Sequence, residues 1–332
     1  MHHAAPDHPS DHDHHRSSSS RREAIRLIAT GVGVAAVGLG GVPSLAQETP
    51  AADPKDPAAL PISLAQWSLH RAIFAGELKP LDFPKVTREV YGLGGCEFVN
   101  AFYRDALDDD ATFAELRRRA EGSGVRNLLI MIDGEGDLGD PDPAKRRDAV
   151  ARHLRWATRC QEIGGSMIRV NAGSKGTREE QAVLVAEGLS QLAAQCEPLG
   201  LSVIVENHGG FSSDGEWLAG VMRKVNRPNC GTLPDFGNFR INQDLVYDRY
   251  DGVRLLMPFA KAVSAKSYDF DGKGDETTID YARMLRIIRE AGYRGWIGIE
   301  YEGNRLSEKD GILATRRLLE RLGCVAAAPV PI

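Results

Sequence analysis

The sequence has few histidines and cysteines, and neither residue type is spaced for a familiar metal or disulfide framework. Six of the nine histidines precede residue 47, so the rest of the 332-residue chain has only His70, His153 and His208. The five cysteines are odd in number and widely spaced, without a Cys-x-x-Cys pair. A small disulfide-stapled scaffold and a histidine-rich metal cluster are therefore excluded.

Basic clusters and a dinucleotide-binding glycine motif are also missing. The net charge is −5, and no run of Lys and Arg follows the pattern of a phosphate-binding surface, so nucleic acid is not an expected partner. No Gly-x-Gly-x-x-Gly follows the first expected strand, which disfavours the alternative fold, a doubly wound open sheet. Because 42% of the residues are hydrophobic, the chain can still bury a large core.

The first 46 residues have the pattern of an export signal. Arg21 and Arg22 precede an apolar, glycine-rich segment at residues 25–45, and small residues up to Ala46 suit cleavage. Arg26 and the glycines make this segment too weak for a stable membrane span, with an uncleaved anchor as the alternative. The sequence predicts a twin-arginine signal peptide at 1–46 and a periplasmic or secreted mature protein.

From residue 62 onward, short apolar runs alternate with amphipathic stretches. Residues 47–60 are expected to form a linker and residues 324–332 a C-terminal tail. The apolar runs predict strands at 62–69, 95–99, 127–132, 167–171, 202–206, 230–235, 260–265 and 295–300. Helices are expected at 83–91, 111–122, 143–163, 178–199, 215–225, 245–257, 281–291 and 308–322. These alternations predict a (β/α)8 TIM barrel over residues 61–323.

Charged side chains end four of the expected strands, all in the second half of the chain. They are Glu206 and His208 on the fifth strand, Asp235 on the sixth, Lys266 on the seventh and Glu300 on the eighth. The carboxyl ends of parallel barrel strands meet at one rim, where such folds keep their chemistry. Carboxylates suit Mg²⁺ and Mn²⁺, and an imidazole admits Mn²⁺, Co²⁺ or Zn²⁺. The pattern predicts a metal-assisted site.

Other polar residues near the strand ends are candidates for substrate binding. They are Glu97, His208, Asn238, Asn171 and His70. Structural roles remain as alternatives for several candidates: a paired carboxylate for Glu97, turn hydrogen bonds for His208, and a solvated strand end for Lys266. Glu302 is expected at the rim, and Arg169 in a structural ion pair.

Residues 62–322 resemble the sugar phosphate isomerase/epimerase superfamily, the xylose isomerase-like barrels that also include endonuclease IV-type DNA-repair enzymes (AP endonuclease family 2). The resemblance rests on the segments 205–210, 233–239 and 297–303, with support from 130–136 and 169–173. It implies that Glu206, Asp235, Glu300 and a histidine on the seventh strand bind one divalent metal. It also implies that the first and last of these carboxylates move the substrate proton.

The seventh strand departs from this pattern, because Ser264 or Lys266 stands where the histidine is expected. Three alternatives follow. His208 replaces the missing ligand, or the metal binds weakly, or Lys266 acts as the electrophile of a metal-free site. The resemblance implies a three-metal, histidine-rich cluster for the DNA-repair enzymes, which three histidines cannot build.

The expected function is a proton transfer next to the carbonyl of a sugar or keto-sugar, with Glu206, Glu300 and Lys266 as catalytic residues. The expected cofactor is one divalent ion, Mn²⁺, Mg²⁺, Co²⁺ or Zn²⁺, held by Glu206, Asp235, Glu300 and His208. Isomerisation or epimerisation is the first reading, and a keto-glycoside lyase or dehydratase is the closest alternative. A non-catalytic periplasmic sugar-binding barrel is the alternative from a different class.

Overall fold

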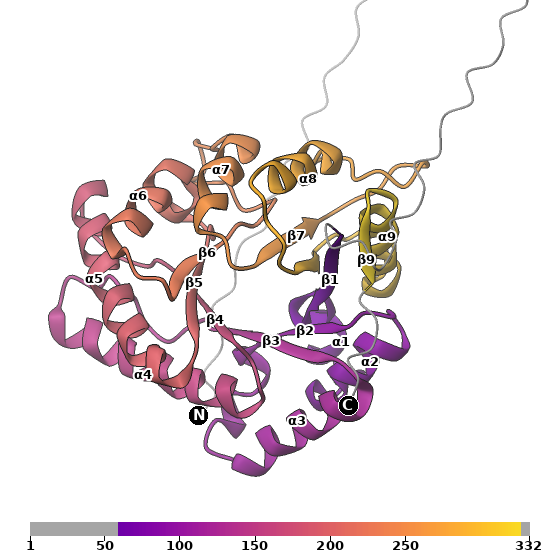
Figure 1. Ribbon diagram of the computed structural model, residues 1–332, viewed down its shortest axis with the longest axis horizontal. Coiled ribbons are helices and arrows are strands. Elements are labelled where there is room, and N and C mark those ends of the chain that lie inside the picture. Colours follow the sequence, from indigo (N-terminus) through magenta and orange to yellow (C-terminus); the bar gives the residue numbers. More distant parts are fainter. Residues whose placement is uncertain (1–58, 327–332) are drawn as a thin grey trace, which may run out of the picture. The chain divides into compact units, whose positions relative to one another are not determined.

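The computed structural model describes residues 59–326, which form a barrel of parallel strands surrounded by helices (Figure 1). The predicted signal peptide, most of the predicted linker and the last six residues of the predicted tail lie outside the described residues. No helix within residues 59–326 is long and apolar enough to cross a membrane.

Eight strands make the barrel wall, and every neighbouring pair is parallel. They are β1 (Leu60–Ala65), β2 (Gly95–Val99), β3 (Arg126–Met131), β4 (Met167–Val170), β5 (Ser202–Glu206), β6 (Cys230–Leu233), β7 (Val263–Ser267) and β8 (Ile297–Tyr301). Their order is β6-β5-β4-β3-β2-β1-β8-β7. Parallel bridges from Thr232 to Ala260 and from Asp235 to Ser264 connect β6 with β7 and close the wall. The predicted (β/α)8 barrel is confirmed.

The helices follow the predicted order, with one addition. They are α1 (His70–Phe74), α2 (Phe83–Glu89), α3 (Asp110–Ser123), α4 (Pro143–Glu162), α5 (Arg178–Cys196), α6 (Gly215–Val225), α7 (Arg249–Leu256), α8 (Tyr281–Glu290) and α9 (Glu308–Arg321). Capping residues explain where several of these helices begin. The Asp142 side chain accepts a hydrogen bond from Ala144 N, and Thr177 forms a capping box with Glu180.

The first strand is shorter than predicted. The sequence predicts a strand to residue 69, but β1 ends at Ala65, and a 3-10 turn over Gln66–Leu69 leads into α1. The buried Gln66 amide holds this turn, because its oxygen accepts from Val99 N and its nitrogen donates to the Tyr103 hydroxyl. Leu69 is buried in this turn just as it would be in a strand, so its apolar character does not distinguish the two conformations.

Alternation along the strands divides the side chains between two buried layers. Val203 and Val205 of β5 belong to the large core between the strands and the helices. Ile204 belongs to a second, smaller core, which also contains Leu129, Met131 and Leu233. Since successive residues of a strand point to opposite faces, Glu206 lies on the same side as Ile204. The inward-facing row of β5 therefore ends in a carboxylate.

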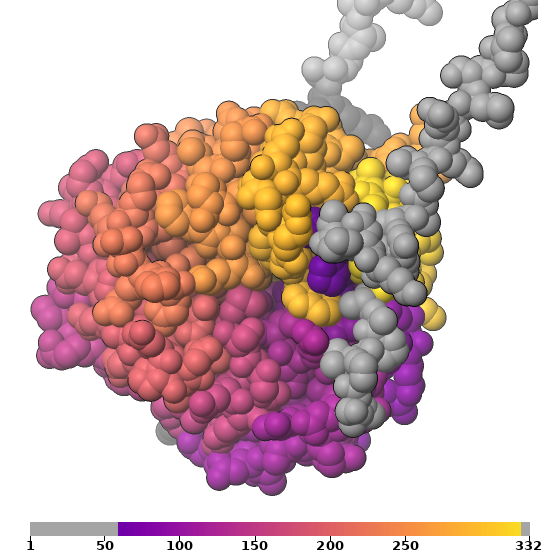
Figure 2. Space-filling model, in the orientation of Figure 1, coloured from indigo at the N-terminus to yellow at the C-terminus, as the bar shows by residue number. Residues whose placement is uncertain are grey.

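The C-terminal segment adds one further strand. Cys324–Ala326, which the sequence places in a tail, form β9 and pair in parallel with Leu60–Ile62 of β1. Leu60, placed in the linker, is the first residue of β1. The first and last described segments, indigo and yellow, accordingly lie side by side (Figures 1 and 2).

Candidate active site

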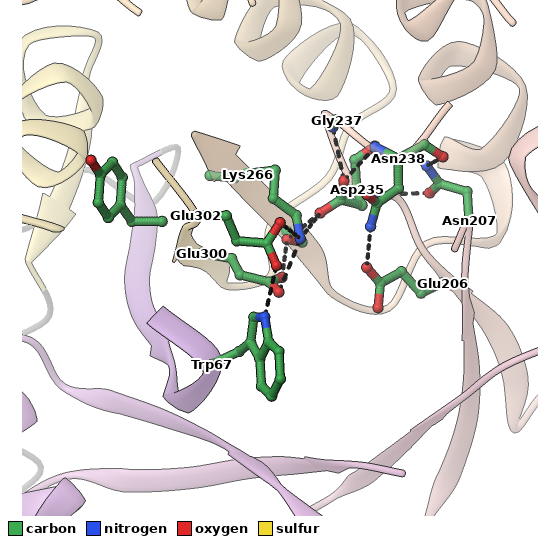
Figure 3. Close-up of polar contacts among 12 residues, drawn as sticks. Trp67, Glu206, Asn207, Asp235, Gly237, Asn238, Lys266, Glu300 and Glu302 are labelled. Carbon is green, nitrogen blue, oxygen red and sulfur yellow. Dashed lines mark hydrogen bonds and ion pairs between the residues drawn. The ribbon is translucent and has the colours of Figure 1, made fainter. Parts of the chain in front are cut away.

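Three predicted ligands meet at the carboxyl ends of the barrel strands. Glu206, Asp235 and Glu300 each offer an oxygen within 4.8 Å of the others, and all three side chains are buried. We call these three residues the carboxylate cluster (Figure 3). They come from the end of β5, the residues after β6, and β8, so three separate walls of the barrel place them together.

The seventh strand supplies both Ser264 and Lys266 to the carboxylate cluster. The two residues are two apart on β7, so both point inward. The Ser264 hydroxyl lies 2.7 Å from Asp235 Oδ2 and 3.0 Å from Glu300 Oε2. The Lys266 ammonium lies 3.0 Å from Glu300 Oε1, 3.2 Å from Glu302 Oε2 and 3.9 Å from Asp235 Oδ2. The position expected for an imidazole ligand is thus filled by a hydroxyl and an ammonium.

These charges displace the pKa values of the cluster in opposite directions. Burial raises the pKa of Glu206 to about 7 against the opposing charge of Arg169. It also raises the pKa of Asp235 to about 7 against that of Lys266. The pKa of Glu300 is lowered in spite of burial, because Lys266 and Arg169 favour its charged form. The pKa of Lys266 is raised in spite of burial, chiefly by Glu300 and Asp235. Lys266 and Arg169 therefore compensate only part of the negative charge of the carboxylate cluster.

Arg169 on β4 is the second cation at the site. Its Nε lies 2.8 Å from Glu206 Oε2, and its Nη1 lies 2.7 Å from Asp133 Oδ1. The Asn171 amide also donates to Asp133 Oδ1, at 2.7 Å. The structure thus shows the ion pair expected for Arg169 and links the predicted substrate-binding residue Asn171 to Glu206 through Asp133 and Arg169.

An amide network fixes the carboxylates at β5 and β6. Asn238 Nδ2 donates to Glu206 Oε1 at 3.0 Å, and Asp235 Oδ1 accepts from the backbone N–H groups of Gly237 and Asn238 (Figure 3). Asn207 donates to the carbonyls of Asp235 and Asn238 and accepts from Asp235 N. Asn207 is absent from the sequence-based list of site residues. Its place between Glu206 and His208, two of the predicted site residues, was the available signal.

His208, the fourth predicted metal ligand, does not join the carboxylate cluster. Its side chain is exposed at the rim, and it is absent from the ligand group that the described residues form. Strand β5 ends at Glu206, and the next residue, Asn207, is buried, so the alternation that would place His208 beside Glu206 does not continue. His208 instead lines a pocket at the rim together with Asn238.

Glu97 of β2, predicted to bind substrate, lies buried on the inward side of the barrel. Ser63 Oγ donates to its Oε1 at 2.5 Å, whereas its Oε2 has no hydrogen-bond partner among the described residues. Burial raises the pKa of this carboxyl to about 7, and the charges of Glu300 and Glu206 act in the same direction. Gly298 leaves the necessary space, because a Cβ there would collide with the Glu97 carboxylate.

His70, also predicted to bind substrate, makes contacts along an aromatic wall. Its ring stacks on Trp67 with centroids 4.7 Å apart, and its Nδ1 lies 2.7 Å from the Trp67 carbonyl oxygen. The Trp67 indole N–H donates to Glu302 Oε1 at 2.7 Å (Figure 3). Trp67 therefore contacts Glu302, which connects it to Lys266, whereas the carboxylate near the His70 ring is that of Glu308, at 3.7 Å.

The residues present fit a divalent cation. Three buried carboxylates converge. Glu206 Oε2 lies 2.8 Å from Arg169 Nε, but no described residue donates a well-aligned hydrogen bond to it. Hard divalent ions prefer such oxygen ligands, and their charge would balance the excess negative charge. Lys266 and Ser264 already contact Asp235 and Glu300, so a cation would share these two carboxylates with the seventh strand.

Comparison with known proteins places this geometry in context. A C-glycoside deglycosidase alpha subunit from Microbacterium trichothecenolyticum is 29% identical over 113 residues, which cover 32% of this chain and 29% of that protein. The chain is therefore aligned with less than a third of that relative's length.

Solved structures share the fold at low sequence identity. A D-psicose 3-epimerase crystallised in the presence of D-fructose superposes with a TM-score of 0.62 at 14% identity, covering 81% of this chain and all of that one. The 3-keto-D-glucoside 4-epimerase of E. coli gives 0.59 at 15%, covering 73% and 94%. A xylose isomerase-like barrel from Mycobacterium smegmatis in complex with magnesium gives 0.60 at 17%, covering 82% and 99%.

The family comparison covers most of the barrel. Residues 88–322 match the family described as xylose isomerase-like TIM barrel, from α2 to the end of α9. This stretch includes all three residues of the carboxylate cluster as well as Lys266 and Arg169. The chain therefore belongs to the xylose isomerase-like TIM barrel family.

Proposed function

We propose that this protein is an enzyme that moves a proton next to the carbonyl of a sugar or keto-sugar, with the help of one divalent metal. The observation that carries the proposal is the convergence of Glu206, Asp235 and Glu300 within 4.8 Å, with the Lys266 ammonium 3.0 Å from Glu300. Such a site combines carboxylates that can exchange protons with positive charge that can stabilise an oxyanion. The epimerases of the same fold are consistent with this reaction class.

A divalent cation bound by the carboxylate cluster would polarise a carbonyl and its neighbouring hydroxyl. In the proposed reaction, Glu206 or Glu300 takes the proton from the carbon that bears this hydroxyl. The C–H electron pair then becomes the C=C bond of the enediolate, and the carbonyl oxygen takes up the negative charge. Lys266 provides fixed positive charge near the developing oxyanion. Return of the proton by the opposite carboxyl gives epimerisation, and transfer on one face gives aldose–ketose isomerisation. Asn238 holds Glu206 in place through its amide.

Elimination is the second candidate reaction, favoured by the similarity to the C-glycoside deglycosidase alpha subunit. The first step is the same proton removal. The carbonyl of the enediolate then re-forms, its C=C electron pair moves to the bond between the α- and β-carbons, and the group at the β-carbon leaves with its bonding electrons and takes up a proton. The enone product absorbs in the ultraviolet, which distinguishes elimination from proton return.

Deuterium exchange tests the proposal. The purified chain is incubated in D₂O with D-fructose, with a 3-keto-glucoside and with a C-glycoside whose sugar carries a 3-keto group, and incorporation is followed by NMR. We expect deuterium at a carbon next to the carbonyl, and loss of at least 100-fold in rate for Glu206→Gln, as is typical when an acid–base group is removed. Glu77→Gln, at an exposed position, is the matched control. Tight sugar binding without exchange or elimination would contradict an enzyme and identify a sugar-binding barrel.

We further propose export of this enzyme through the twin-arginine pathway, for which Arg21 and Arg22 ahead of the apolar segment are the support. That pathway carries proteins folded in the cytoplasm. A metal acquired before export would then travel with the barrel. The five free cysteines agree with folding that needs no disulfide.

A further inference from the structure

We infer that the site has a subsite for an anionic group, so that its sugar substrate carries a carboxylate or a phosphate. The inference rests on the proposed function and names the class of sugar. It is carried by a pocket of about 570 Å³ at the rim, which we call the rim pocket. The side chains that matter here are those of His208, Asn238, Arg240, Arg249, Tyr268 and Thr278.

The rim pocket is directly connected to the carboxylate cluster. Asn238, one of its lining residues, donates to Glu206 Oε1 at 3.0 Å (Figure 3). Tyr268 and Gly237 form another part of the lining, where a Cβ at Gly237 would collide with the Tyr268 hydroxyl and lie 2.8 Å from Lys266 Cγ. This wall of the pocket therefore packs against Lys266. A sugar bound at the cluster would extend into the pocket.

The guanidinium of Arg249, the first residue of α7, has no partner among residues 59–326. Its Nη1 is buried and has no hydrogen-bond partner, and its guanidinium forms no ion pair with any residue of the described part. Arg178, the first residue of α5, shows the usual arrangement, since its Nη2 lies 2.6 Å from Asp214 Oδ2. A buried N–H without an acceptor is costly, and the cost disappears when a ligand supplies the acceptor.

The charge around Arg249 also favours an anion. Arg240 lines the same pocket, and its only side-chain hydrogen bond within residues 59–326 goes to the Gln243 carbonyl at 3.3 Å. No Asp or Glu is among the described residues that line the rim pocket. The rim pocket therefore has two arginines, Arg240 and Arg249, next to a cluster of three carboxylates, in a chain whose net charge is −5. The planar guanidinium fork matches carboxylate and phosphate oxygens.

Three ketoses that differ only at carbon 6 test this inference. D-fructose has a hydroxymethyl group there, D-fructuronate a carboxylate and D-fructose 6-phosphate a phosphate ester. Binding to the full chain is measured by calorimetry in EDTA, so that no bound divalent ion attracts the anion. We expect at least one acidic ketose to bind about tenfold more tightly than D-fructose, the gain typical of a charge-assisted hydrogen bond. The tighter of the two acidic ketoses identifies the anionic group.

Variants assign the preference to Arg249. Arg249→Gln should lose the preference for the acidic ketose and keep its affinity for D-fructose. Arg254→Gln, an exposed position on the same helix that pairs with Glu290 at 3.8 Å, should keep both. Equal binding of all three ketoses, or an undiminished preference in Arg249→Gln, would overturn the inference. A chain that binds none of them, and exchanges no deuterium with any keto-sugar, would contradict the proposed function itself.

Discussion

The Lys266 ammonium lies 3.0 Å from Glu300 Oε1, inside a barrel whose relatives are expected to place a histidine on the same strand. Both side chains are buried, and Lys266 also contacts Glu302 and Asp235. A fixed ammonium thus places positive charge directly beside the carboxylate cluster. The carboxylate cluster is partly neutralised before any cation binds.

Replacing Lys266 with Met should make the protein more dependent on metal for stability. Loss of the ammonium leaves Glu300 and Glu302 without their nearest cation, so the metal-free variant should lose about 3 kcal/mol or more of unfolding free energy. Mn²⁺ should then raise the melting temperature more in the variant than in the natural chain. Thermal melts in EDTA and in Mn²⁺ measure this difference.

The control for this experiment is Lys85→Met, which removes an exposed ammonium 3.8 Å from Glu89 and should change little. If Mn²⁺ stabilises Lys266→Met no more than the natural chain, Lys266 does not compensate the carboxylate cluster.

Glu97 should make stability depend on pH. Its carboxyl has a pKa raised from its usual 4.5 to about 7 in the folded chain, so the folded state holds the proton more tightly than the unfolded state. This contribution is fully present below pH 4.5 and is lost as the pH rises to about 7. The unfolding free energy of the natural chain minus that of Glu97→Gln should therefore fall by up to about 3 kcal/mol across this window. Urea unfolding at a series of pH values measures the difference; a constant value would refute it.

His208→Ala should leave Mn²⁺ affinity within about threefold, because the His208 side chain is exposed and outside the carboxylate cluster. Glu206→Gln should instead weaken Mn²⁺ by tenfold or more, as expected for a disturbed metal site. Calorimetric titration of metal-free protein gives both numbers. A tenfold loss in His208→Ala would restore His208 as a ligand.

Replacement of Arg21 and Arg22 by Lys should leave the precursor in the cytoplasm, because the twin arginines are the feature on which the pathway depends. Cell fractionation followed by immunoblotting measures the distribution. Mature protein in the periplasm at normal levels would rule out this route.

Strand alternation made the barrel and the carboxylate cluster predictable. The runs before Glu206, Asp235 and Glu300 have the composition of buried parallel strands, and such strands end at a common rim. The inward position of Lys266 was predictable for the same reason, because Ser264 and Lys266 are two apart on one strand and therefore share its inner side. Its three carboxylate partners follow only from the arrangement of β6, β7 and β8 in space.

Alternation fails as a guide where the strand stops. His208 shares the parity of Glu206, yet the chain leaves β5 at Glu206 and buries Asn207 instead. Trp67 likewise lies beyond the end of its strand, in the 3-10 turn after β1, where its indole contacts Glu302. Strand alternation therefore does not predict this contact either. The Glu97 site depends on Gly298, 201 residues later in the sequence, a contact that local patterns do not contain.

The most direct test of the proposed chemistry is deuterium incorporation into a keto-sugar in D₂O, with and without chelator. We expect exchange by the natural chain, strong inhibition by EDTA, and recovery on addition of Mn²⁺ or Co²⁺. The amide variant of all three cluster residues, Glu206→Gln with Asp235→Asn and Glu300→Gln, should not recover. Exchange that continues undiminished in EDTA would contradict a metal-assisted site at Glu206, Asp235 and Glu300.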